Sequence, residues 1–246
     1  MRLRASRTFL LLLLTASLLT AGQAVKEKDL PQKYQDWLKL TAYIISEKEK
    51  DVFMRLSTDR ERDLFIESFW KQRDPTPGTP QNEYQEEHIK RFNYANENFR
   101  RGAGREGWMT DMGRIHIILG PAVSYDRMPT SSDVYPYEIW TYYGDPEKGL
   151  PSHFCLVFFQ RGGVGEYKLY SPISDGPTSL LVQGRKMDPF DYEEAYRKLL
   201  DLEPSLAPVC LSYVPGDFGY DFQPSPQNAI ILADIFESPK KNVNPA

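Results

Sequence analysis

The sequence predicts an α+β fold, in which N-terminal helices pack on one face of a four-stranded antiparallel meander and a proline-rich C-terminal appendage follows. Two observations predict this fold. Apolar residues recur three and four positions apart from Leu30 to Phe99, and they alternate with polar residues after Gly107. A block of helices followed by a block of strands is typical of the α+β class. We expect a main domain at 25–172, with a helical half at 25–106 and a sheet half at 107–172.

The composition is that of a globular protein. The chain has 246 residues, of which 41% are hydrophobic and 26% charged, and 30 basic against 34 acidic side chains give a net charge of −4. No basic stripe is present that could neutralise phosphates. We therefore expect no nucleic-acid partner.

Residues 1–24 are predicted to be a secretory signal peptide. Three arginines precede an apolar run of 11 residues from Phe9 to Leu19, and small residues follow at Gly22 and Ala24, the positions that a signal peptidase reads. An uncleaved anchor helix is the alternative, but a spanning helix needs roughly 20 residues. We expect cleavage after Ala24, a product in the bacterial periplasm or secreted, and no stable membrane insertion. Loss of the three arginines makes the mature charge −7.

The helical half contains several signals for the start and end of helices. Ser46-x-x-Glu49 and Thr58-x-x-Glu61 fit the capping box, in which the first and fourth side chains satisfy each other's backbone N–H groups. The helix that starts at the second box should end at Asp74-Pro75, because the residue before proline is pushed out of the helical region. Thr79 followed by Pro80 predicts the start of another helix, which runs to about Arg100.

Alternation in the sheet half predicts four strands, at 114–119, 137–143, 153–160 and 164–170. Arg161-Gly162-Gly163 predicts a tight turn with positive φ between the last two strands. Strands joined in succession by short turns favour an antiparallel meander.

The remaining residues, 173–246, are predicted to form an extended appendage wrapped on the main domain, since residues 171–246 hold ten prolines. Helical spacing is seen at Tyr192–Leu202. Two short apolar runs, Val209–Val214 and Ala229–Phe236, are interpreted as short strands.

Common cofactor and metal motifs are missing or out of context. Gly102-x-Gly104-x-x-Gly107 has the letters of the dinucleotide fingerprint, but it follows a helix and precedes a strand, the reverse of the required order. The three histidines lack zinc-binding spacing. His88 falls in the apolar stripe of its helix, so we interpret it as a core histidine, with a ligand as the alternative. We expect no cofactor and no metal ion.

Three groups of residues are candidates for structural or binding contacts: a charged network, an aromatic strip and a pair of cysteines. Charged and polar residues beside a proline turn predict a structural network, with a binding site as the alternative. Aromatic residues along one strand predict either an exposed binding strip or core, since strand alternation buries half of them. The two cysteines, in an exported protein, form either one disulfide or two buried thiols. The network is Arg73, Asp74, Asn82, Glu83 and Arg91; the strip is Tyr125, Tyr135, Tyr137, Trp140, Tyr142 and Tyr143; the cysteines are Cys155 and Cys210.

Between the two halves stands Gly107-Trp108-Met109-Thr110-Asp111. Thr110 to Gly113 is predicted to form a type I turn, with side-chain acceptors early and glycine last. Trp108 can bury a large area and fix the angle between the halves. We interpret the motif as a structural hinge lock; the alternative is a ligand site that uses Trp108, Thr110, Asp111 and Arg114.

The same five residues resemble the signature of the GWxTD domain family. The resemblance covers residues 30–172: Phe69-Trp70-x-x-Arg73-Asp74-Pro75 and Arg91-x-x-Tyr94-Ala95-Asn96 are similar to its helical half, and Gly113-Arg114-x-x-Ile117-x-x-Gly120-Pro121 and Glu138-x-Trp140-x-Tyr142 to its sheet half. Ala122 departs from the pattern where a second proline is common. The resemblance implies an exported bacterial module of uncharacterised function, with no catalytic residues to transfer. A weaker likeness, at fold level, is to the small lipoprotein of the outer-membrane β-barrel assembly machinery, whose lipid-acceptor cysteine is lacking here.

Two functions follow from these observations. The first is a non-catalytic envelope module that binds another protein through the aromatic strand region, including Tyr137, Trp140 and Tyr142. The second is an envelope hydrolase that uses Asp111, Glu83 or Glu138 as general acid or base. An enzyme should show two of these carboxylates converging in a pocket, whereas a binding module should show an exposed apolar patch.

Overall fold

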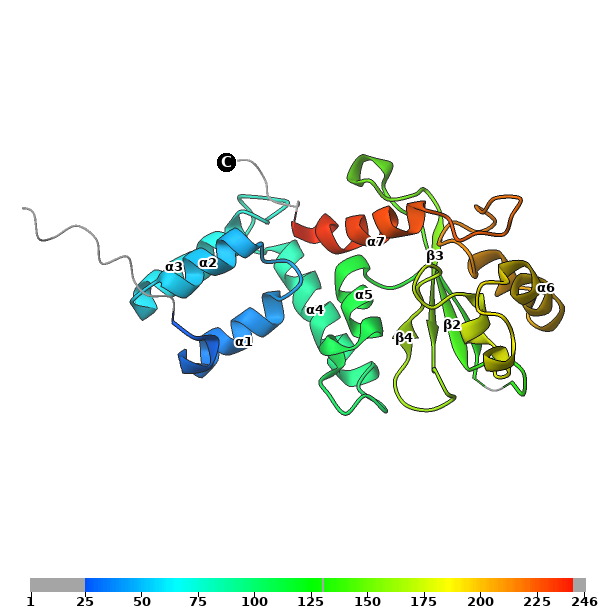
Figure 1. Ribbon diagram of the computed structural model, residues 1–246. Coiled ribbons are helices and arrows are strands. Elements are labelled where there is room, and N and C mark those ends of the chain that lie inside the picture. The colour runs from blue at the N-terminus through cyan, green and yellow to red at the C-terminus, as the bar shows by residue number, and fades with distance from the viewer. Residues whose placement is uncertain (1–24, 130, 241–246) are drawn as a thin grey trace, which may run out of the picture.

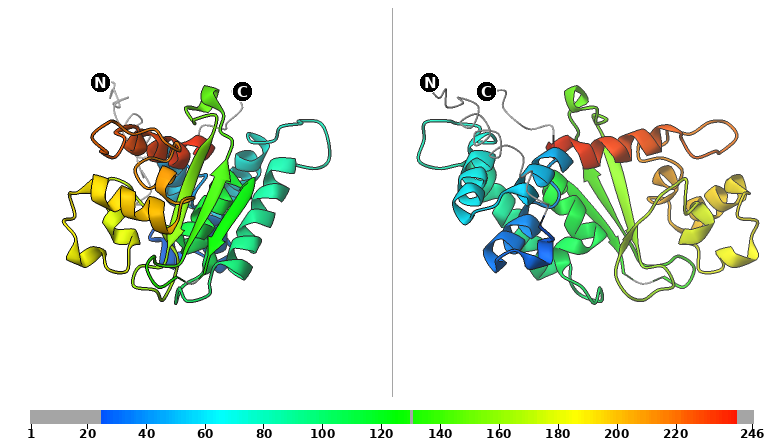
Figure 2. Two further views of the ribbon diagram at one scale, coloured as in Figure 1. Left: turned by 90° about the vertical axis from the view of Figure 1, so that its right-hand side faces the viewer. Right: turned by 60° about the vertical axis from the view of Figure 1, so that its left-hand side comes forward.

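The computed structural model describes residues 25–129 and 131–240. The predicted signal peptide, residues 1–24, lies outside the described residues. Three layers make up the main body: helices α4 (Glu83–Asn98) and α5 (Asp111–Leu119), a four-stranded sheet, and a C-terminal layer that includes α6 (Tyr192–Leu202) (Figure 2, left). Helices α1 (Gln32–Thr41), α2 (Glu47–Arg55) and α3 (Asp59–Lys71) form a separate bundle that packs beside α4 (Figure 1). No helix within the described ranges has the length and apolar character to cross a membrane.

The N-terminal bundle forms as its capping signals predict. Ser46 and Thr58 cap α2 and α3, and each completes a capping box with Glu49 or Glu61. The bundle has its own aromatic core, in which the Trp37 ring packs 4.6 Å from Phe53. The three helices are α1 (Gln32–Thr41), α2 (Glu47–Arg55) and α3 (Asp59–Lys71).

Helix α4, Glu83–Asn98, starts later than predicted. Asn82, not Thr79, is its N-cap, because the Asn82 side chain accepts from the Gln85 amide (2.9 Å). The Thr79 hydroxyl is already committed to the preceding turn, where it donates to the Gln81 carbonyl (2.9 Å).

The strand predicted at 114–119 is wrong, because Asp111–Leu119 forms helix α5. Six of its nine residues are buried. A helix buried on most sides lacks an amphipathic period of 3.6, so its apolar run cannot be distinguished from a strand by periodicity. The first strand is instead β1, Ser124–Met128, which is exposed and carries no such run.

The predicted four-stranded antiparallel meander is confirmed, with order β1-β2-β3-β4. Strand β2 (Tyr137–Tyr142) and strand β3 (Phe154–Phe159) form the centre, and β4 (Lys168–Leu169) is short. Register pairs Ile139 with Val157 and Trp140 with Leu156, and these two pairs point to opposite faces. Both faces of the sheet are therefore buried. The sequence predicted helices on one face only.

The C-terminal residues supply the second cover. Helix α6, Tyr192–Leu202, is where the sequence predicts it, and Leu199, Leu206 and Leu211 pack against the β2–β3 face. The two strands predicted in this region are wrong. In place of the strand at Val209–Val214, Ala207–Val209 forms a 3₁₀ turn and residues 210–214 form bends and irregular structure. In place of the second, α7, Gln227–Glu237, is a helix that buries Ile231 and Ile235, four residues apart, against the α5 side.

Cys155 and Cys210 are both buried free thiols. Of the two alternatives, one disulfide or two buried thiols, the structure therefore has the second. Both pack in the core between the sheet and the C-terminal layer. Burial raises the pKa of Cys210 to about 12. His88 is a core histidine, as expected, with Nε2 2.7 Å from the Leu40 carbonyl oxygen.

Candidate functional site

The glycines at the signature permit close approach of backbones. Gly107 begins a 3₁₀ turn, Gly107–Met109, that lies against α4. A Cβ atom at Gly107 would lie 2.8 Å from both the Ala95 carbonyl carbon and the Asn96 Cα, and closer still to the Ala95 oxygen. A Cβ at Gly113 would collide in the same way with the Gly107 carbonyl. Only glycine fits at either position without a shift of main chain.

Thr110 and Asp111 fasten the start of α5. The Thr110 hydroxyl donates to the Gly107 carbonyl (2.7 Å) and accepts from the Gly113 amide (3.0 Å), as an N-cap does. The Asp111 carboxylate accepts from the Leu169 amide of β4 (3.0 Å). The type I turn predicted at Thr110–Gly113 is therefore wrong, because these residues form the cap and first turn of a helix.

Trp108 and Arg114 join α4 and α7 (Gln227–Glu237) to this junction. The Trp108 amide donates to the Asn96 side chain of α4 (3.1 Å), and its ring stacks on Phe92 at 5.9 Å. The Arg114 guanidinium lies 3.5 Å from the centroid of the Phe236 ring of α7. The four predicted binding candidates at the signature thus make their contacts within the chain.

The predicted exposed aromatic strip is wrong for its central members. Tyr137, Trp140 and Tyr142 are 2%, 1% and 5% exposed, on both faces of the sheet. Tyr137 donates to the Glu203 carboxylate (3.1 Å), and burial raises its pKa to about 12. Tyr143, which follows the end of β2, is 70% exposed. The alternative that these rings are core therefore holds for three of them, whereas Tyr135 is half-buried and Tyr125 and Tyr143 are exposed.

Four of the five predicted network residues meet around the turn between α3 and α4. Arg73 is buried and forms an ion pair with Glu49 (2.8 Å), which joins α3 to α2. Around residues 74–83, Asp74 accepts from the Thr76 amide (3.0 Å), and the Thr76 hydroxyl donates to Glu83 (2.6 Å). Asn82 donates to the Trp70 carbonyl (2.7 Å).

Arg91 does not join this network. It pairs with Glu87, one turn earlier on α4, at 2.8 Å. Its guanidinium lies under Gly120, where a Cβ would come within 2.9 Å of the Arg91 Cζ. Gly120 has φ +81°, which also requires glycine and explains the turn after α5.

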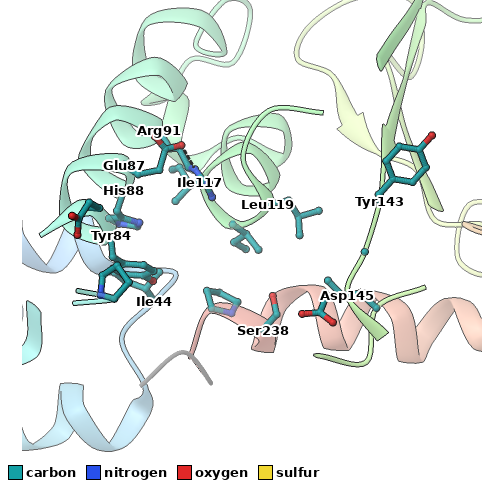
Figure 3. Close-up of a pocket in the computed structure, with 16 residues that line it drawn as sticks. Ile44, Tyr84, Glu87, His88, Arg91, Ile117, Leu119, Tyr143, Asp145 and Ser238 are labelled. Atoms are coloured by element: carbon teal, nitrogen blue, oxygen red, sulfur yellow. Dashed lines mark hydrogen bonds and ion pairs between the residues drawn. The ribbon is translucent and has the colours of Figure 1, made fainter. Parts of the chain in front are cut away.

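Arg91 and Glu87 instead form one wall of a cleft of about 500 Å³, which we call the α4–α5 cleft (Figure 3). Tyr84 and His88 come from α4, Ile117 and Leu119 from α5, and Tyr143 and Asp145 from the β2–β3 connection (Figure 3). The end of α7 closes another side through Ser238. The full lining is Ile44, Pro75, Glu83, Tyr84, Glu87, His88, Arg91, Ile117, Ile118, Leu119, Tyr143, Gly144, Asp145, Leu150, Ser238 and Pro239.

The cleft has an apolar floor and charged groups above it. Ile44, Ile117 and Leu150 are buried residues of the lining. A hydrogen bond from Arg91 lowers the pKa of Glu87, and one from Thr76 lowers that of Glu83, so both are ionised at neutral pH. Burial lowers the pKa of His88 to about 4, which leaves its imidazole neutral.

A second pocket, of about 410 Å³, lies beside the signature and contains two carboxylates, Glu138 and Glu166. Glu138 pairs with Arg127 (3.2 Å), while Glu166 pairs with Arg105 (3.0 Å) and with Lys168. Burial raises the pKa of Glu166, but the hydrogen bonds from Lys168 and Arg105 outweigh burial and lower it. Glu166 and the cleft residues Glu87 and Asp145 are not predicted by any motif of the sequence. Only Glu87, four residues before Arg91 on a helix, carries a local signal.

Among the described residues, no cluster of three or more histidine, cysteine, aspartate or glutamate side chains could hold a metal ion. The three carboxylates named for a hydrolase lie apart: Glu83 lines the α4–α5 cleft, Glu138 lines the second pocket, and Asp111 bonds to β4. The three carboxylates therefore do not converge on one pocket. The two pockets are concave surfaces that could bind a ligand or partner.

Comparison with known proteins gives one match. The profile of the GWxTD domain matches residues 14–160, whereas no curated protein and no solved structure matches the chain. The weaker likeness to the β-barrel assembly lipoprotein therefore stays a prediction. Because the match covers more than half of the chain and includes the junction described above, this chain belongs to the GWxTD domain family.

Proposed function

We propose that this chain is an exported, non-catalytic protein-binding module of the bacterial cell envelope, whose partner docks in the α4–α5 cleft. The proposed export and envelope location rest on the signal-peptide pattern of residues 1–24. The docking site replaces the aromatic strip that the sequence predicted, because three of those rings are buried.

One observation carries the proposal: the cleft combines an apolar floor with an exposed aromatic ring beside it. Its volume of about 500 Å³ falls within the range of pockets that hold small molecules and cofactors, roughly 300–1,000 Å³. Tyr143 stands 70% exposed in its lining. Tyrosine is one of the side chains that most often dominate binding energy at protein interfaces.

The alternative, a hydrolase with carboxylate acid and base, has less support. Acid–base hydrolysis needs one carboxyl group that stays protonated near neutral pH beside one that is ionised. Glu83, Glu138 and Asp111 do not converge. Glu138 and Glu166 do share a pocket, but the pKa of Glu166 is lowered by its cationic neighbours rather than raised.

Site-specific photo-crosslinking in the native cells tests the proposal. A photoreactive phenylalanine replaces Tyr143 in one variant and Tyr220, which is fully exposed on the C-terminal layer, in a matched control. We expect a discrete adduct of higher mass from position 143 and none from position 220. Adducts from position 220 alone would show that the docking face lies elsewhere.

A further inference from the structure

The second pocket, beside the signature, has an apolar base and a charged rim. Thr110 and Met112 are buried residues of its lining. The rings of Tyr94 and Phe99, from the end of α4, also line it and stand edge to face at 5.7 Å. Its volume of about 410 Å³ is within the range of pockets that hold small molecules, roughly 300–1,000 Å³. The base therefore suits an apolar or aromatic body.

Both carboxylates of the rim are already engaged by donors of the chain. Glu138 accepts from the Trp140 indole through Oε2 (2.8 Å), and its Oε1 lies 3.2 Å from the Arg127 Nε. Glu166 accepts from Arg105 through both oxygens, at 3.0 and 3.1 Å. Each of the four oxygens thus faces a donor. A cationic ligand would have to displace one of these donors, so the pocket disfavours a cation.

Arg101 is the cation of the lining that has no acceptor. Its guanidinium forms no ion pair or hydrogen bond with another described residue. Glu97, one turn earlier on α4, does not line this pocket and does not pair with it. Arg105, Arg127 and Lys168 bring the cations around the pocket to four, against two carboxylates. A free guanidinium at a pocket with spare positive charge favours an anionic oxygen ligand.

We propose that the second pocket binds a small organic acid, with its carboxylate on the Arg101 guanidinium and its apolar or aromatic body against Tyr94, Phe99 and Met112. A singly charged carboxylate is favoured over a phosphate dianion, because the chain as a whole has a net charge of −4 and repels the dianion more. The proposal does not rest on the proposed function, since the second pocket and the α4–α5 cleft share no lining residue.

Three probes with the same aromatic body test the proposal: 3-phenylpropionate, 3-phenylpropanamide and 2-phenylethylphosphonate. Binding is followed by NMR of the ¹⁵N-labelled chain at the indole N–H resonances. The Trp140 resonance should shift, because its indole donates to Glu138 in the rim, whereas those of Trp37 and Trp70 in the N-terminal bundle should not. We expect 3-phenylpropionate to bind at least tenfold more tightly than the amide, and more tightly than the phosphonate.

Two variants locate the carboxylate. Arg101→Gln should weaken binding of 3-phenylpropionate about three- to tenfold and leave the amide unchanged. Arg100→Gln is the matched control, since Arg100 is the exposed neighbour in the chain and does not line the second pocket. It should change neither probe by more than about twofold. The difference between the two variants should narrow as salt rises.

Three results would overturn the proposal: an unchanged Trp140 resonance at millimolar 3-phenylpropionate, equal binding of the acid and the amide, or equal loss in both arginine variants, which would mean a general effect of charge. Tighter binding of the phosphonate would reject the choice of a carboxylate. The proposed function is judged separately, by crosslinking from position 143. An adduct there with no binding of the acid would retain the docking site and reject the ligand of the second pocket.

Discussion

Replacement of Gly107 by alanine tests how the signature acts. The added methyl group would lie 2.8 Å from the carbonyl carbon of Ala95 and from the Cα of Asn96, both in the main chain of α4. Gly107 is not among the residues with positive φ, so backbone conformation alone would tolerate alanine. Because helical main chain cannot rotate away as a side chain can, the 3₁₀ turn and α4 must separate.

The expected cost follows from the contacts that separation disturbs. Overpacking of a tight site costs about 1–3 kcal/mol. Lengthening the bond from the Trp108 amide to Asn96, now 3.1 Å, adds about 1 kcal/mol. We expect a loss of about 3 kcal/mol in the free energy of unfolding, which for a chain of this size lowers the Tm by about 6–12 °C.

The assay is urea unfolding followed by tryptophan fluorescence, together with a thermal melt. Gly219→Ala is the matched control, since a methyl group there would meet only the Asp221 carboxylate, which can rotate. We expect the control to stay within about 0.5 kcal/mol of wild type. A Gly107→Ala variant as stable as the control would refute the idea that the signature glycine exists for close packing.

Three further predictions follow from the same structure. Thr110→Val removes the N-cap of α5 and should cost about 1–2 kcal/mol, whereas Thr110→Ser keeps the hydroxyl and should be close to wild type in the same unfolding assay; equal loss in both would contradict a capping role. Burial lowers the pKa of both His88 and His116 to about 4, so between pH 6.5 and 4 the unfolded chain binds protons that the folded chain does not. The free energy of unfolding should be full above about pH 6.5 and, below it, fall by up to about 1.4 kcal/mol per pH unit for each histidine. Urea midpoints that are flat from pH 7 to 5 would contradict this. Cys155 and Cys210 should resist a thiol reagent in the native state and titrate as two thiols in denaturant without reductant, whereas a count of zero would mean a disulfide.

Local signals predicted the N-terminal bundle well. The capping boxes at Ser46 and Thr58 involve residues three positions apart, so the sequence contains the whole interaction. Helix α6 has a strong amphipathic pattern because one side faces the core and the other faces water. The buried state of His88 followed from the same kind of pattern.

The wrong strand at 114–119 was predicted where burial on most sides removes the helical period of apolar residues. Residues 111–119 lie between α4, the sheet and α7, so their apolar run has no polar side to identify a helix. Helix α7 is different, because only Asn228, Ile231 and Ile235 of its residues are buried; its pattern is obscured by apolar residues on the exposed side, such as Ile230. Once 114–119 was assigned to the sheet, the cap at Thr110 could only be interpreted as a turn.

The candidate site was harder to predict from the sequence than the fold was. The α4–α5 cleft combines residues as distant as Ile44 and Pro239, which no spacing rule connects. The aromatic strip failed because both faces of the sheet are covered: the C-terminal layer buries Tyr137, and residues of α5 and α7 bury Trp140 and Tyr142. Tyr143, which lies one residue beyond the end of β2, and Tyr125, on the exposed strand β1, kept exposed positions.

The central claim is that the family signature builds the junction between helices and sheet, while the partner docks at the α4–α5 cleft. Met109, the variable residue within the signature, is 43% exposed and can carry a photoreactive side chain as Tyr143 can. Crosslinking in cells from these two positions, side by side, is the most direct measurement. The account predicts a partner adduct from position 143 and none from position 109; an adduct from position 109 in the absence of one from 143 would contradict it.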